Sequence, residues 1–157
     1  DDAMKWLEKG TDLYDLVFVD FPDPSSFSVG KLYTKHFYGR LKRRLAPDGA
    51  FAVQATSPLF ARKSFWIIDR TIEASGFATR PYHAAVPSFG EWGYVLAAPR
   101  PLEIPARLIP GLRFLSDETL AAMFSFGPDM SRWEAPVNRL HDQVLVRTYE
   151  GEWRKFE

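Results

Sequence analysis

The sequence predicts an α/β domain with a mainly parallel sheet, helices on the faces of the sheet and an antiparallel end. Over the first hundred residues, short apolar runs alternate with longer amphipathic stretches, and turn-forming Pro, Asp and Gly residues separate them. The last two apolar runs are only a few residues apart, which is the spacing of a hairpin rather than of a helical crossover. In sheets of this kind ligands bind beyond the carboxyl ends of the strands, so we expect a functional site at that edge.

The composition predicts one domain with a core and excludes several classes of ligand. The 157 residues are 46% hydrophobic, which is enough for one domain with a core, and no apolar run has the length of a membrane span. Twenty basic residues balance twenty acidic ones, so we expect no nucleic-acid partner, and a charged ligand needs a local site. The chain has no cysteine, and its three histidines lack the spacing of metal ligands. We therefore expect neither a disulfide nor a metal site.

The first part of the domain is expected to hold two helices and a strand. Residues 2–9 predict a short helix with Asp2 at its N-terminus, where the helix dipole favours a carboxylate. Residues 15–20 (DLVFVD) are too few for a helix and rich in Val and Phe, which is typical of a strand buried on both faces. Residues 32–45 place apolar side chains on one stripe, and Pro47-Asp48-Gly49 is expected to end this helix in a turn.

The second part is expected to complete the sheet. Residues 50–55 predict another buried strand, and residues 61–75 an amphipathic helix that ends at Gly76. Strands over 79–86 and 92–98 would form the hairpin.

Beyond the hairpin, three regions of the chain are distinguished. The domain would span residues 1–98, a proline-rich linker 99–115, and a helical tail 116–157, with helices over 116–124 and 142–156. We expect the tail to pack on the domain in a structural role.

The strongest candidate site is the loop after the first predicted strand. Asp20 and Asp23 are three residues apart, and Pro22 and Pro24 fix the backbone there and leave few amides to neutralise the carboxylates. Close carboxylates repel each other, so either one keeps a proton or a cation lies between them, and a polyamine would supply that cation. A simple Asp-Pro turn explains the same residues equally well.

The hairpin offers a second part of the site. Phe89, Glu91 and Trp92 lie in or beside the turn, where neighbouring glycines let the backbone come close. Next to the Asp20 loop, Phe89 and Trp92 would flank an alkyl chain, while Glu91 or the aspartates would hold its ammonium ends. In isolation, cross-strand aromatic packing is the more common explanation for such a turn.

Two further polar residues are weaker candidates. Gln54, near the end of the second predicted strand, would accept a hydrogen bond from an amine or fix one of the aspartates, or would only complete the hydrogen bonding of the sheet end. Asp2 would accept from an adenine amino group or would only cap its helix. No nucleophile is paired with a base, so the sequence does not support acyl transfer.

These pieces occur together and in this order in one family. The first hundred residues resemble the C-terminal part of spermidine synthases, which are polyamine aminopropyltransferases, and residues 137–154 (VNRLHDQVLVRTYEGEWR) resemble the tail of the longer bacterial members. The matching motifs are Asp2-Ala3 with Trp6-Leu7, YDLVFVDFPDP (14–24), LYTKHFYGRLKRRLAPDG (32–49), Val53-Gln54 and PSFGEWGYVLA (87–97). The resemblance implies the C-terminal half of a Rossmann-like fold of the class I methyltransferase type.

The resemblance also implies a reaction and a role for each candidate. An aminopropyl group would pass from decarboxylated S-adenosylmethionine, the co-substrate, to putrescine or a related diamine, with no separate cofactor. Asp20 would act on the attacking amine, and Asp2 and Ala3 would contact the adenine. The residues expected to bind the diamine are Asp23, Gln54, Phe89, Glu91 and Trp92. Many members have Gly in place of Ala3 and Tyr in place of Phe89, and the missing hydroxyl bears on the identity of the acceptor.

Part of the family's nucleotide site precedes the matching segments. Its glycine-rich loop and N-terminal β-rich domain are not found here, and the sequence begins without Met. We therefore expect a fragment that is inactive alone, from a cytoplasmic enzyme that forms a homodimer. An upstream membrane tether, as in many longer members, is compatible with this expectation.

Two other functions fit the same residues. A methyltransferase that uses S-adenosylmethionine would have the same sheet topology, although most methyl acceptors have no need of a pocket with two carboxylates. A non-catalytic polyamine-binding module would use the same aspartate pair, and no feature of the sequence separates it from an enzyme.

Overall fold

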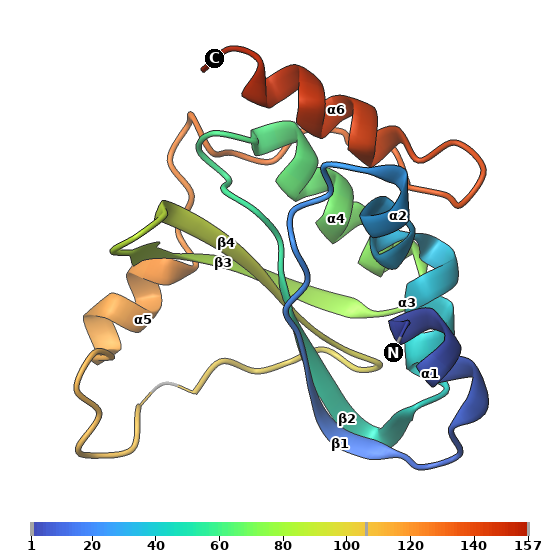
Figure 1. The fold of residues 1–157 in the computed structure, drawn as a ribbon. Helices are drawn as coiled ribbons and strands as arrows, with labels where there is room; N and C mark the ends of the chain where they lie inside the picture. The colour runs from blue at the N-terminus through green and yellow to red at the C-terminus, as the bar shows by residue number, and fades with distance from the viewer. Residues whose placement is uncertain (1, 106, 157) are drawn as a thin grey trace.

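Four strands form one mixed sheet in the computed structural model, which describes residues 2–105 and 107–156 (Figure 1). They are β1 (Tyr14–Val19), β2 (Leu45–Gln54), β3 (Ala78–Val86) and β4 (Gly90–Ala98), in the order β1-β2-β4-β3. β1 and β2 pair in parallel, whereas β4 is antiparallel to both of its neighbours. The α/β class is therefore confirmed, with the refinement that β4 inserts between β2 and β3. The carboxyl ends of β1, β2 and β3 lie at the same edge.

Helices precede the first strand of this sheet, connect its strands or follow its last strand. They are α1 (Ala3–Lys9), α2 (Phe27–Gly30), the 3-10 helix η1 (Lys31–Tyr33), α3 (Lys35–Lys42), α4 (Arg62–Ala74), α5 (Asp117–Met123) and α6 (Val144–Trp153). Of the described residues in the proline-rich segment, 99–105 and 107–116, none lies in a helix or strand. The last helix, α6, is shorter at both ends than predicted.

The predicted helix over 32–45 is wrong in its extent. Thr34 has an extended backbone, and its side chain accepts a hydrogen bond from the Phe37 amide at 3.3 Å, so it ends η1 and begins α3 as an N-cap. The turn predicted at Pro47-Asp48-Gly49 lies inside β2 as an irregularity, because Tyr14 pairs with Leu45 while Leu16 already pairs with Ala50.

Helices α3 and α4 cover one face of the sheet. Phe51 and Val53 of β2 and Val95 of β4 point to this face and are fully buried in the core. On β1, by contrast, Leu16 is 53% exposed and Phe18 is 74% exposed. The prediction that this strand is buried on both faces is therefore wrong for the described residues, because none of their helices covers the second face there.

A buried asparagine joins the tail to the domain. Asn138 donates through Nδ2 to the carbonyl of Tyr33 at 3.1 Å and to that of Gly30 at 3.3 Å, and its Oδ1 accepts from the Leu145 amide at 3.2 Å. One side chain thus satisfies backbone groups of α2, η1 and α6, which fixes the tail beside the loop after β1.

A buried glutamate makes a second connection. Glu152 of α6 accepts from the amides of Lys63 at 2.8 Å and Ser64 at 3.0 Å, which are orphan donors in the first turn of α4. Ala61, the N-cap of α4, makes no side-chain hydrogen bond of its own. The tail therefore supplies the cap that α4 lacks.

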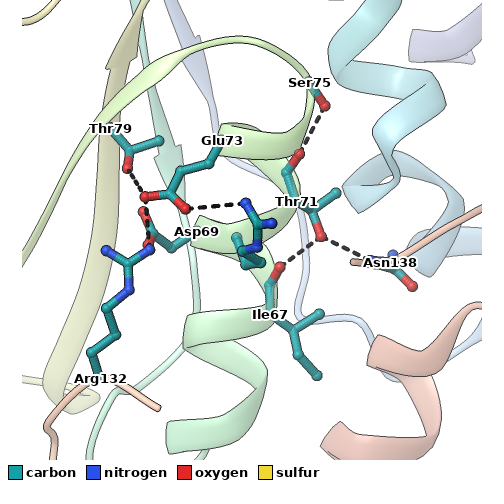
Figure 2. A network of polar contacts seen from close by, with 9 residues as sticks. Ile67, Asp69, Thr71, Glu73, Ser75, Thr79, Arg132 and Asn138 are labelled. Carbon is teal, nitrogen blue, oxygen red and sulfur yellow. Dashed lines mark hydrogen bonds and ion pairs between the residues drawn. The ribbon is translucent and has the colours of Figure 1, made fainter. Parts of the chain in front are cut away.

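A third connection involves a buried carboxylate. Figure 2 shows Arg132 of the tail approaching both Asp69 and Glu73 of α4, at 3.2 and 2.7 Å. Asp69 is fully buried, and burial raises its pKa from 3.8 to about 6, with a smaller contribution from the nearby Glu73 charge. The Thr79 hydroxyl, and to a smaller extent the charges of Arg132 and Arg70, lower this pKa and only partly offset the effect of burial.

Stability should consequently fall as Asp69 ionises. Because its folded-state pKa is the higher one, the contribution to stability is complete below pH 3.8 and is lost as the pH rises to about 6. We expect Asp69→Asn to raise the free energy of unfolding by about 3 kcal/mol at pH 7.5 and to change it little at pH 4. Urea denaturation at both values measures this, with the exposed Asp12→Asn as control. An equal effect at the two pH values would contradict the prediction.

Candidate active site

A cavity of about 730 Å³ lies at the carboxyl ends of β1 and β2 and under the β3–β4 turn. Its lining residues are Phe18, Val19, Asp20, Phe21, Pro22, Asp23, Ala52, Val53, Gln54, Tyr82, Val86, Phe89, Trp92 and Tyr94. Among them the only charged side chains are those of Asp20 and Asp23. The cavity therefore combines an aromatic wall with net negative charge, which favours an elongated cation with an apolar middle.

The two aspartates differ in their surroundings. Asp23 is half-buried and its carboxylate accepts three side-chain hydrogen bonds, whereas Asp20 is exposed and accepts none from the described residues. Asp23 is thus held in one orientation, while both oxygens of Asp20 stay available to a ligand.

Three elements hold Asp23. Gln54 at the end of β2 donates to Oδ1 at 3.1 Å, Thr56 donates to Oδ2 at 3.3 Å, and Tyr149 of α6 donates to Oδ2 at 2.7 Å. The structure therefore places Gln54 as an orienting partner of Asp23, one of the three interpretations that the sequence left open.

The backbone at Thr56 is unusual. Its φ is +63°, a left-handed conformation that a β-branched residue rarely adopts. Its carbonyl accepts from the Gly93 amide at 2.7 Å, and a Cβ at residue 93 would lie 2.7 Å from that same oxygen and 2.5 Å from the Phe65 ring. Only glycine at 93 allows this approach, and the side chain of the same Thr56 donates to Asp23.

Burial and the aspartate charges raise the pKa of two tyrosines near the cavity. Tyr33 is fully buried, and its hydroxyl donates toward the carbonyls of Phe21 and Pro22 and toward Gln54 Oε1, at 3.1 to 3.3 Å. Burial raises the pKa of Tyr33 well above 10, and the charges of Asp23 and Asp20 raise it further. Burial also raises the pKa of Tyr94, and the Asp20 charge adds to the shift. Both phenols therefore remain protonated.

The hairpin supplies the aromatic wall. Phe89 is 61% exposed, and its ring centroid lies 5.2 Å from that of Trp92. Tyr82 and Tyr94 stack at 5.2 Å farther along the same face. Phe89 and Trp92 thus share one cavity with Asp20 and Asp23, as predicted.

Glu91 is not brought to the cavity. Adjacent residues of a strand point to opposite faces, and β4 begins at Gly90, so Glu91 faces away from the side that carries Trp92. It pairs instead with His83 Nδ1 at 2.5 Å, while His83 Nε2 lies 2.8 Å from the Ser125 carbonyl. The structure contradicts the expectation that Glu91 binds the substrate in this cavity, and pairs it with His83, which in turn contacts the tail.

Asp2 and Ala3 also lie outside the cavity. Asp2 caps α1 through the Met4 amide at 2.9 Å and pairs with Lys31 at 2.7 Å, and these contacts lower its pKa, the Lys31 contact most. Ala3, the first residue of α1, packs against the core. The capping interpretation of Asp2 is confirmed, and its contact with a nucleotide stays a prediction.

Sequence reasoning missed two of the residues that hold Asp23, and also Tyr82 and Tyr94 of the cavity wall. Thr56 lies two residues beyond Gln54, and the polar run after the strand was the available signal. Tyr149 is 126 positions from Asp23, and its place in an amphipathic tail gave no sign of this contact.

The family of the chain follows from comparison with known proteins. The Spermine/spermidine synthase domain matches residues 1–103, and the chain belongs to this family. A polyamine aminopropyltransferase of Leptospira interrogans is 49% identical over 154 residues, which cover 98% of this chain and 31% of the relative. Polyamine aminopropyltransferase 2 of Ralstonia nicotianae is also 49% identical over 154 residues, covering 97% of this chain and 30% of the relative. The chain thus spans less than a third of these relatives.

Solved structures support the fold. A crystal structure of spermidine synthase in complex with the transition state analogue AdoDATO superposes with a TM-score of 0.66 at 23% identity, and covers 81% of this chain and 46% of the other. Spermidine synthase from Thermotoga maritima gives a TM-score of 0.64 at 21% identity, and covers 81% and 45%. In the part of the chain that is described, no helix is both long and apolar enough to cross a bilayer.

Proposed function

We propose that the protein containing this chain transfers an aminopropyl group from decarboxylated S-adenosylmethionine to a diamine such as putrescine, and releases spermidine and methylthioadenosine. The observation that carries the proposal is the cavity in which the only charged lining residues are two aspartates, set against the rings of Phe89 and Trp92. A diamine matches this arrangement because its ends are cationic and its middle is apolar.

The reaction is an in-line displacement. The neutral amine nitrogen attacks the propyl carbon next to the sulfonium, so a C–N bond forms as the C–S bond breaks and sulfur keeps the electron pair. Sulfonium is a good leaving group, and the task of the protein is to align the two reactants and remove a proton from the amine.

The two aspartates divide this task. Asp23, fixed by its three donors, anchors the diamine. Asp20, which accepts no hydrogen bond from the described residues, takes up the proton of the attacking nitrogen. An alkyl ammonium has a pKa of about 10, and a nearby carboxylate raises it further. Desolvation against Phe21, Phe89 and Trp92 opposes that effect, because burial disfavours the charged form of the amine.

The proposal is tested with the whole protein, since this chain spans only 31% of its relative from Leptospira interrogans. Purified protein is incubated with putrescine and either decarboxylated or ordinary S-adenosylmethionine. We expect spermidine and methylthioadenosine from the decarboxylated donor only. Methyl transfer from the ordinary donor would identify a methyltransferase, and calorimetric binding of putrescine without turnover would identify a binding module.

We also propose that this chain alone does not bind the donor well. Neither Asp2 nor Ala3 lies at the cavity, and Asp2 is engaged with Met4 and Lys31. Calorimetry with methylthioadenosine should show binding to the whole protein and no measurable heat with residues 1–157. Equal affinity for both would refute this second proposal.

A further inference from the structure

We propose that Tyr149, on the C-terminal helix α6, is a positioning residue for the diamine: its hydroxyl holds the Asp23 carboxylate in the orientation that binds the ammonium group. This inference rests on the proposed function. It assigns part of the site to the tail, which lies beyond residues 1–103 matched by the synthase domain.

The hydrogen bonds at Asp23 define what Tyr149 does. Its hydroxyl lies 2.7 Å from Oδ2, the shortest of the three contacts, and Thr56 donates to the same oxygen at 3.3 Å. On the other carboxylate oxygen, Oδ1, the donor from Gln54 uses only one of the two acceptor lone pairs. Two donors therefore fix Oδ2 away from the ligand and leave Oδ1 with free acceptor capacity. Tyr149 does not line the cavity, so it acts through Asp23.

Tyr149 is a permanent donor. Burial raises its pKa well above 10, and the hydrogen bond to Asp23 and the charge of that carboxylate raise it further. The phenol thus keeps its proton at every pH at which an enzyme of this kind is assayed, and its hydrogen bond to Asp23 is retained throughout that range.

The helix that carries Tyr149 is firmly attached. Leu145 and Val146, one turn before it, are buried at 0% and 1% exposure. Glu152, one turn after it, binds the amides that begin α4 at 2.8 and 3.0 Å. Because α6 is anchored on both sides of residue 149, the position of the hydroxyl is set by the domain rather than by a loose tail.

Tyr149→Phe in the whole protein tests the inference. A hydrogen bond to a charged group is lost, so we expect kcat/KM for putrescine to fall about tenfold, mainly through KM, with the KM of the sulfonium donor within twofold of its original value. Calorimetry should show a similar loss of putrescine affinity. Tyr38→Phe is the matched control, because it removes a buried hydroxyl that, unlike that of Tyr149, has no hydrogen-bond partner among the described residues and lies outside the cavity.

A second measurement asks whether Tyr149 acts through Asp23. In the Asp23→Asn background, Tyr149→Phe should change kcat/KM by less than twofold. An unchanged putrescine KM in the single variant, or a full tenfold effect in the double variant, would overturn the inference. Absence of aminopropyl transfer by the unmodified protein would instead refute the proposed function, and calorimetry would still report on Tyr149.

Discussion

Replacing Asp20 with Asn in the whole protein is expected to lower kcat by about 100- to 10,000-fold while the KM for putrescine changes less than about threefold. Asn has nearly the same shape and still accepts a hydrogen bond, but it does not take up a proton. Asp20 is exposed and accepts no hydrogen bond from the described residues, so the substitution should leave the surrounding structure intact. Steady-state kinetics with the diamine varied at saturating donor measures both constants.

Two matched substitutions complete this experiment. Asp23→Asn should act mainly on the KM for the diamine, since Asp23 is the aspartate held by three donors. Asp15→Asn, an exposed position on β1 outside the cavity, should leave both constants unchanged. If Asp20→Asn raises the KM for putrescine and leaves kcat unchanged, Asp20 binds the substrate without acting as the base.

The second large effect concerns stability. Asn138→Ala is expected to lower the free energy of unfolding by about 3–5 kcal/mol, because it leaves the Leu145 amide and the carbonyls of Gly30 and Tyr33 without their partner in a fully buried place. The loss should be larger than for an ordinary buried hydrogen bond, since one side chain serves three segments. Urea denaturation followed by tryptophan fluorescence measures it.

Arg139→Ala is the control for this measurement. Residue 139 is the exposed neighbour of Asn138, and its substitution should change stability by no more than about 0.5 kcal/mol. A loss below about 1 kcal/mol in Asn138→Ala would show that the tail is not held to the domain in the way described.

Local patterns predicted much of the fold. The apolar run before Asp20 and the amphipathic stretch before Gly76 identified β1 and α4, because strand and helix periodicities are properties of short segments. The same reasoning placed Gln54 beside the loop that carries Asp20 and Asp23, since neighbouring parallel strands end at one edge. It failed at Thr34, where a capping side chain interrupts an otherwise continuous amphipathic pattern.

The remaining differences have two physical causes. Glu91 was assigned to a turn before a strand over 92–98, but β4 begins at Gly90 and so includes Glu91. Adjacent residues of a strand point to opposite faces, so Glu91 points away from the face of Trp92. Tyr149 reaches Asp23 only because buried contacts of Asn138 and Glu152 dock α6 on the domain. Contacts over more than a hundred residues depend on packing, and no short motif encodes them.

At Thr56, which has a left-handed backbone, a substitution that improves stability is expected to impair the site. Asn or Gly adopts this conformation at lower cost, by roughly 1–2 kcal/mol, so a library selected for heat resistance alone should enrich these residues at position 56. Glycine would remove the hydroxyl that reaches Asp23 at 3.3 Å, and asparagine would present a differently shaped amide in its place. Laboratory evolution toward a more heat-resistant protein should therefore weaken the hydrogen bonding of Asp23 at this position first, unless activity is screened together with stability.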